Sequence, residues 1–131
     1  VEGLPEVHAR LKRVLILNDD AISVIKKEDG PRTLFYLDPP YLAEERTGGA
    51  CHYVEEMSTD DHSELVDKLL RLQGSVVLSC YYNELYAPLG KAGWQLHTFD
   101  RNAGSTTKRL RKSERRQECV WVSPRLQVRG K

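Results

Sequence analysis

Short apolar runs, separated by polar segments and turn residues, recur along this chain. The first is Val14-Leu15-Ile16-Leu17, and a second, from Thr33 to Leu37, follows the turn Asp29-Gly30-Pro31. Runs of four to eight apolar or aromatic residues that are bounded by turn residues are typical of buried strands. The pattern predicts five strands, at residues 14–17, 33–37, 75–81, 94–99 and 119–122.

Helical spacing of apolar residues fills most of the intervals between these runs. Asp20 can cap a helix that extends to about Lys27, and Ser58, followed by acidic residues, can cap a second one that ends before Gly74. A shorter helix is expected over 85–89, closed by Gly90. Strands that alternate with helices predict an α/β domain with a mostly parallel sheet. The last two strands have no helix between them, so we expect them to be antiparallel neighbours.

The sequence Asp38-Pro39-Pro40-Tyr41 follows the second predicted strand directly. In α/β folds, ligands bind just beyond the carboxyl ends of such strands. Each proline removes a backbone donor and fixes φ, so the loop presents mainly acceptors, namely the Asp38 carboxylate and nearby carbonyls. Acceptors of this kind suit a planar amino group, and Tyr41 offers a ring for stacking. The loop therefore predicts a site for a nucleobase amino group. The alternative is that the prolines only end the strand and Asp38 caps a turn.

Leu37-Asp38-Pro39-Pro40-Tyr41 resembles the hallmark motif of the amino-methyltransferases that use S-adenosylmethionine. The flanking sequence is similar to the phage-like branch of the Dam-type DNA adenine methyltransferases over roughly residues 10–124. The similar segments are Val14 to Ile25, Thr33 to Tyr36, Tyr53 to Ser58 with His62, Leu65 and Leu69, Leu78 to Tyr81, Glu84 to Tyr86, and Glu118 to Val122.

The resemblance implies methylation of DNA, as in restriction–modification, at the exocyclic nitrogen of an adenine flipped out of the duplex. Asp38 and the Pro39 carbonyl would accept the amino protons, Pro40 belongs to the same catalytic loop, and Tyr41 would stack on the base. S-adenosylmethionine would be the cofactor, contacted by Asp20 and Asp38. The resemblance calls for no metal and no covalent enzyme intermediate. From the residues alone, Asp20 is equally well explained as a helix cap.

Two parts of the family pattern are not found in this sequence. Family members carry a glycine-rich cofactor loop after their first strand, and Gly48-Gly49 neither follows a strand nor opens a helix. Family sheets run in the order 3-2-1-4-5-7-6, in which residues 14–17 would be the third strand and 33–37 the fourth. We therefore expect residues 1–131 to form a single, incomplete, Rossmann-like methyltransferase domain that lacks the first two strands. Its apolar edge would require rearrangement, self-association or a second polypeptide to cover it.

A net charge of +1 conceals a strong asymmetry along the chain. Residues 1–100 contain 17 acidic and 10 basic residues, whereas residues 101–131 contain 2 acidic and 10 basic residues. Such a basic segment suggests contact with nucleic acid phosphates, and the alternative is a solvated surface loop. The candidate DNA-binding residues are Arg101, Lys108, Arg109, Arg111, Lys112, Arg115 and Arg116.

The remaining composition excludes several other classes of protein. Three scattered cysteines do not make a disulfide framework, which favours a reducing, cytoplasmic location. Cys51-His52 lacks a second pair at zinc spacing, so no metal site is expected. Cys80 is expected to be a core residue. Apart from DNA adenine methylation, two functions stay open: an RNA base methyltransferase, and a non-catalytic remnant or half of a split enzyme that binds DNA or a partner.

Overall fold

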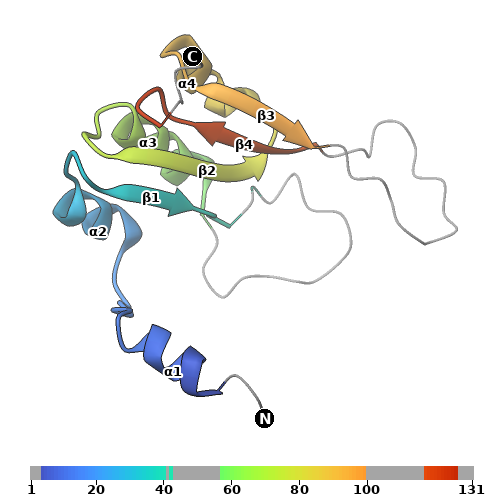
Figure 1. Ribbon diagram of the computed structural model, residues 1–131. Coiled ribbons are helices and arrows are strands. Elements are labelled where there is room, and N and C mark those ends of the chain that lie inside the picture. The colour runs from blue at the N-terminus through green and yellow to red at the C-terminus, as the bar shows by residue number, and fades with distance from the viewer. Residues whose placement is uncertain (1–3, 41, 43–56, 100–116, 127–131) are drawn as a thin grey trace, which may run out of the picture.

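Four strands form one mixed sheet in the order β1-β2-β4-β3 (Figure 1). The computed structural model describes residues 4–40, 42, 57–99 and 117–126. The strands are β1 (Leu34–Leu37), β2 (Ser75–Tyr81), β3 (Gln95–Phe99) and β4 (Glu118–Val122). β1 and β2 are parallel, whereas β4 is antiparallel to both β2 and β3. Three strands therefore share one direction, and the predicted α/β class and antiparallel last pair are confirmed.

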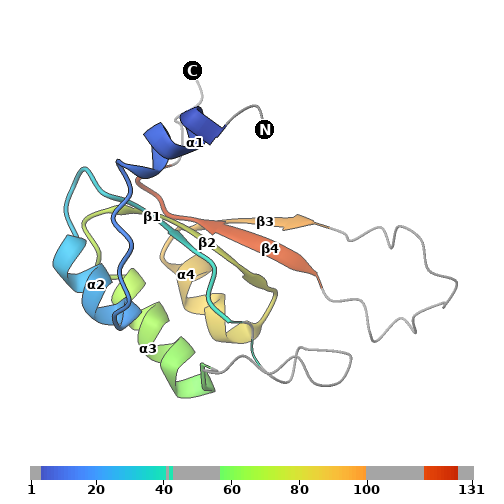
Figure 2. The same cartoon turned by 90° about the horizontal axis from the view of Figure 1, so that it is seen from below.

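The helices that follow and precede these strands gather on one face of the sheet (Figure 2). They are α2 (Ala21–Glu28), α3 (Thr59–Leu69), the 3-10 helix η2 (Glu84–Tyr86) and α4 (Ala87–Lys91). Both predicted caps are present, since the side chains of Asp20 and Ser58 accept hydrogen bonds at the starts of α2 and α3. Gly90 does not close its helix as expected. The chain turns later, at Gly93, whose φ of 85° suits a residue without a Cβ.

The hydrophobic core lies between this face and the helices. Along β2, Val76, Leu78 and Cys80 are buried against the helices, and the alternate residues of the strand are only half-buried. Because neighbouring side chains on a strand point to opposite faces, the second face of the sheet is open to solvent among the described residues. Other core side chains are Ile25, Leu65, Val66, Leu69, Tyr86, Leu89, Trp94, Cys119 and Trp121.

A single carboxylate ties together the turns at the amino ends of the two parallel strands. Asp29 Oδ1 accepts hydrogen bonds from the backbone N–H groups of Gln73 (3.0 Å) and Gly74 (2.9 Å). A Cβ at Gly74 would lie 2.9 Å from the Thr33 carbonyl oxygen and 3.0 Å from the Phe35 ring, so the close approach requires glycine. These contacts help to set the alignment of β1 with β2.

The predicted strand at residues 14–17 is wrong. This segment has no regular structure, and Leu15 and Ile16 are 80% and 84% exposed. A strand needs a neighbour to pair its backbone groups, and in the described part of the chain β1 pairs only with β2. Residues 14–17 therefore carry a strand-like apolar pattern but pair with no strand in the described structure. A helix that the sequence did not predict, α1 (Leu4–Leu11), precedes it and has no buried residue.

β1 is the outermost of the described strands on its side of the sheet. Its Leu34 and Tyr36 side chains, which alternate with the core-facing Phe35 and Leu37, lie on the open face of the sheet and are 59% and 67% exposed. Among the described residues, no helix is long and apolar enough to cross a membrane.

Truncating the core should be far more costly than truncating the exposed segment. We expect Leu78→Ala, at a fully buried site, to lower the free energy of unfolding by about 2–5 kcal/mol because it leaves a cavity. The matched variant Leu15→Ala should change it by less than about 0.5 kcal/mol. Urea denaturation followed by circular dichroism measures both, and equal losses would contradict this description of the core.

Candidate active site at the carboxyl end of strand β1

The proline loop lies at the carboxyl end of β1, where the sequence placed it. Leu37 is the last residue of β1 and aligns with Leu78 of β2. Pro39 and Pro40 have no N–H group to continue the ladder, so the strand ends there. Asp38 is exposed and the two prolines are half-buried. Tyr41 lies outside the described residues.

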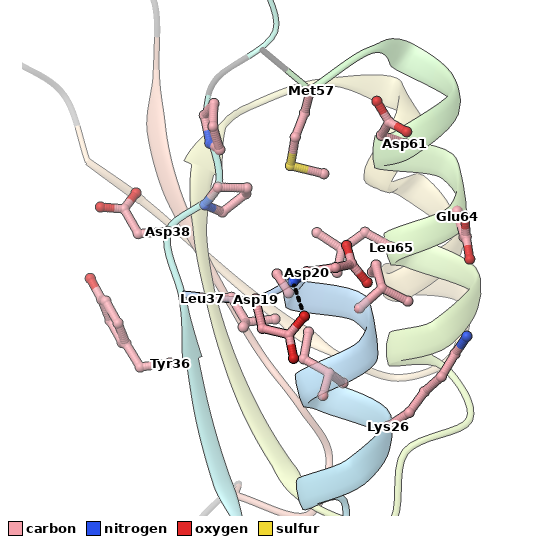
Figure 3. Close-up of a pocket in the computed structure, with 15 residues that line it drawn as sticks. Asp19, Asp20, Lys26, Tyr36, Leu37, Asp38, Met57, Asp61, Glu64 and Leu65 are labelled. Carbon is pink, nitrogen blue, oxygen red and sulfur yellow. Dashed lines mark hydrogen bonds between the residues drawn. The ribbon is translucent and has the colours of Figure 1, made fainter. Parts of the chain in front are cut away.

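A cavity of about 670 Å³ opens beside this loop, between the start of α2, the end of β1 and the first turns of α3 (Figure 3). Its volume is within the range of small-molecule sites. The predicted site residues Asp20, Asp38, Pro39 and Pro40 all line it. The other lining residues are Asp19, Ala21, Ile22, Ile25, Lys26, Tyr36, Leu37, Met57, Asp61, Glu64 and Leu65.

The residues of this cavity differ in where they point. Figure 3 shows Tyr36 and Asp38 on one side of β1, whereas Met57, Asp61 and Leu65 lie on the other side, toward α3. Residues 36 and 38 are two apart on an extended chain, which explains why they share a side. The structure thus brings Asp20 and Asp38 to one cavity, but their carboxylates do not point toward each other.

Asp20 is the N-cap of α2. Its Oδ2 accepts a hydrogen bond of 2.8 Å from the Ser23 backbone N–H, and its own N–H donates to Asp19 Oδ1, also at 2.8 Å. The hydrogen bonding of Ser23 lowers the pKa of Asp20 below its usual value. Of the two explanations that the sequence left open, the helix cap is therefore confirmed. Oδ2 of Asp20 accepts the capping hydrogen bond, and Asp20 also lines the cavity.

The charge around the cavity is strongly negative. Five carboxylates line it, against the single cation Lys26 among the described lining residues. The five are Asp19, Asp20, Asp38, Asp61 and Glu64. Such a surface attracts a cationic group and repels phosphates.

Asp61 is a cavity residue that the sequence analysis treated only as part of a helix start. Its Oδ2 accepts hydrogen bonds from the Ser58 N–H (2.8 Å) and the Ser58 Oγ (2.7 Å), and its N–H donates to Ser58 Oγ. This reciprocal capping box fixes the first turn of α3 beside the loop. The spacing of Ser58 and Asp61 predicts the helix cap, but it does not predict that Asp61 lines the cavity.

His62 is a buried histidine of α3 that is not among the lining residues of this cavity. It is completely buried, and its Nδ1 lies 2.8 Å from the Tyr86 hydroxyl, with the two rings nearly perpendicular at 88°. Burial lowers the pKa of His62, and the nearby Pro40 carbonyl opposes that effect by favouring the protonated ring. The sequence places His62 and Pro40 22 positions apart, and no spacing rule links them. Only the resemblance had included this residue.

Other predicted features have different outcomes. Cys80 is a buried core residue, with its Sγ 3.4 Å from that of Cys119 on the neighbouring strand. Within the described ranges, no group of three histidine, cysteine or acidic residues is arranged to hold a metal ion. The candidate DNA-binding residues, Arg101, Lys108, Arg109, Arg111, Lys112, Arg115 and Arg116, lie outside the described residues, as do Gly48, Gly49, Cys51 and His52.

Comparisons with known proteins found no family model, no curated protein and no solved structure that matches this chain.

The Asp61 capping box should make stability depend on pH in the acid range. Because hydrogen bonds from Ser58 lower the pKa of Asp61 below about 3.8, its contribution is complete above that pH and is lost as the pH falls through the lower folded-state pKa. We expect Asp61→Asn to be less stable than the wild type at neutral pH, with the difference shrinking below pH 4. Thermal unfolding across this range measures it. Asp60→Asn, which removes a neighbouring charge from the same turn, should show a smaller pH-dependent difference, and equal behaviour would contradict the assignment.

Proposed function

We propose that this chain is the acceptor-site part of an adenine-specific DNA methyltransferase, which transfers the methyl group of S-adenosylmethionine to the exocyclic amino group of a flipped adenine. One combined observation carries the proposal: Asp38-Pro39-Pro40-Tyr41 follows the outermost parallel strand of a sheet ordered β1-β2-β4-β3. Asp38, Pro39, Pro40 and Tyr41 are its catalytic residues.

The strand order supports this proposal because it agrees with one half of the family sheet. In the family order 3-2-1-4-5-7-6, the last four positions read 4-5-7-6. With β1 as the fourth strand, the observed order β1-β2-β4-β3 becomes 4-5-7-6, including an antiparallel strand in the seventh position. A Rossmann-like methyltransferase domain without its first strands accounts for both the order and the free edge of β1.

The acceptor chemistry of the loop suits an amino group. The Asp38 carboxylate and the Pro39 carbonyl accept the two amino protons, and this leaves the nitrogen lone pair directed toward the methyl donor. Tyr41 stacks on the flipped base. Transfer is then an in-line displacement whose rate depends mainly on positioning. The product amine loses its extra proton to Asp38 or to water.

The cavity beside the loop fits part of the cofactor. Its carboxylates complement a cationic sulfonium, and the apolar side chains of Ile22, Met57 and Leu65 could pack against the adenine ring of the cofactor. Asp20 and Asp38 contact the cofactor in this proposal. S-adenosylmethionine supplies an electrophilic methyl group when it is bound. Residues for its methionine end come from a glycine-rich loop that is not found in this sequence.

The free edge of β1 supports a role for a second polypeptide. The outer edge of β1 has unpaired backbone groups among the described strands, and Leu34 and Tyr36 leave apolar surface exposed on the open face beside it. A polypeptide with the glycine-rich loop and the first strands of the sheet would cover this edge and complete the cofactor site. Self-association through the same edge is the alternative.

Mixing tests the enzymatic proposal. We expect the chain alone to transfer little label from S-adenosylmethionine to adenine-containing duplex DNA, and the mixture with such a polypeptide to transfer it readily. In the active mixture, Asp38→Asn should lower kcat by at least about a hundredfold, because it removes the main acceptor at the reacting nitrogen. Asp60→Asn, on the exposed first turn of α3, is the matched control and should leave the rate unchanged.

Three results would change this assignment. An Asp38→Asn rate equal to that of the wild type would rule out the proposed acceptor. Faster transfer to RNA than to DNA in competition would favour an RNA base methyltransferase. No transfer in any mixture, together with tight binding of the chain to DNA, would favour a non-catalytic DNA-binding role. In that case the exposed apolar surface at β1 would be a site for a protein partner.

The basic segment should determine how DNA binding depends on salt. We propose that its seven arginines and lysines contact phosphates. Replacing Arg109, Arg111 and Lys112 by alanine should therefore reduce the slope of log K against log salt by about 2.7, at roughly 0.9 for each lost contact. Fluorescence anisotropy on a labelled duplex measures the slope. Replacing Lys26, Lys27 and Lys68, which lie on α2 and α3, removes the same charge and should change the slope much less.

A further inference from the structure

We propose that Cys80 and Cys119 are a redox-sensitive pair, which an oxidant converts into a disulfide that joins β2 to β4. The two residues lie directly opposite each other in the antiparallel pairing of these strands, and their sulfur atoms are 3.4 Å apart. This inference goes beyond the proposed function and does not depend on it. It assigns a site of covalent modification to two side chains that otherwise only fill the core.

The backbone at this position has the spacing that a disulfide needs. Antiparallel ladders alternate between opposite residues that exchange hydrogen bonds and opposite residues that do not. The Tyr82 N–H donates to the carbonyl of Gln117, the residue opposite, at 2.9 Å. Cys80 and Cys119 lie two positions from that pair, so they belong to the hydrogen-bonded class, whose Cα atoms are about 5.5 Å apart. Disulfides most often join Cα atoms that are separated by about 5.5–6 Å.

The two side chains also point in the same direction. Opposite residues on neighbouring strands share a face of the sheet, and here that face is the one covered by the helices. Cys80 and Cys119 are only 2% and 1% exposed, and one thiol lies within hydrogen-bonding distance of the other sulfur. A small rotation of the two side chains therefore brings the sulfur atoms to bonding distance without a change in strand register.

Hydrogen peroxide is an oxidant that balances the reaction. The thiolate of one cysteine attacks a peroxide oxygen, the O–O bond breaks, and the hydroxide that leaves takes up the thiol proton as water. This first step produces a sulfenic acid. The second sulfur then attacks the sulfenic sulfur to form the S–S bond, and the hydroxyl group leaves as water with the proton of the second thiol. Two electrons pass from the two sulfurs to the peroxide.

Burial sets the rate of this oxidation. A reagent reaches the sulfur atoms when the surrounding structure opens, so oxidation is slower than that of an exposed thiol. The pair lies close to the carboxyl end of β2, where the described pairing with β4 ends. Once one sulfur is oxidised, the other is already beside it, which favours the internal disulfide over reaction with a second molecule. In a reducing compartment the pair stays as two thiols, and the disulfide forms under oxidative conditions.

The disulfide would connect the two halves of the sheet covalently. Among the described strands, the pairing of β2 with β4 is what joins β1 and β2 to β4 and β3. The chain between the two cysteines includes η2, α4 and β3. Closing this loop restricts the unfolded chain, so the oxidised protein should resist separation of β4 from β2.

Peptide mapping of a Cys51→Ser chain tests the proposal, because this variant retains Cys80 and Cys119 as its two cysteines. After treatment of the folded chain with hydrogen peroxide and tryptic digestion without reductant, peptides 72–91 and 117–125 should be found joined. Dithiothreitol should separate them. Sulfinic or sulfonic acid on either cysteine, a disulfide-linked dimer, or two unmodified thiols as the main product would overturn the proposal.

Glutathione buffers measure whether the folded geometry favours the bond. The same variant is equilibrated with mixtures of oxidised and reduced glutathione, once folded and once unfolded in urea. Folding should raise the equilibrium constant for the internal disulfide by at least about tenfold, because a bond that fits the fold is stabilised by folding as much as it stabilises the fold. An equal or smaller constant in the folded chain would show that the two positions do not fit a disulfide, and this would overturn the proposal.

Discussion

The parallel pairing of β1 with β2 is the constraint on which the rest of this structure depends. It aligns the carboxyl ends of the two strands, so the proline loop and η2 emerge at the same rim of the sheet. It also directs the connecting helix α3 across one face, because parallel strands need a crossover connection. The cavity beside Asp38 opens at that rim. β1 has only four residues and, among the described strands, one neighbour, so this pairing is short as well as essential.

The remaining packing is asymmetric, and the asymmetry agrees with the proposed function. All helices from α2 onward lie on one face, and the outer edge of β1 has no described neighbour. A parallel strand is normally buried on both faces, and here Leu34 and Tyr36 are not. The site and the uncovered edge lie on the same strand. The outer edge of β1 therefore lies next to Asp38.

Much of the fold could be predicted from the sequence because the local signals agreed with the tertiary structure. The four observed strands are apolar runs with turn residues at their ends, and Asp20 and Ser58 are the caps that their positions suggested. Residues 14–17 carry an equally clear strand pattern, but strand formation depends on a partner, which no local pattern reveals. The loop at Asp38 was found because its chemistry is local. The hydrogen bond between His62 and Tyr86 could not be predicted because the fold brings these residues together from separate elements.

The carboxylate of Asp29 has a consequence for how the molecule opens. It belongs to the connection before β1, yet its hydrogen bonds protect the amides of Gln73 and Gly74, which precede β2. Release of α2 and β1 from the sheet would expose those two amides to solvent even if α3 and β2 stayed in place. Their hydrogen-exchange rates therefore report the docking of β1, and with it the local unfolding free energy of the strand that carries the site.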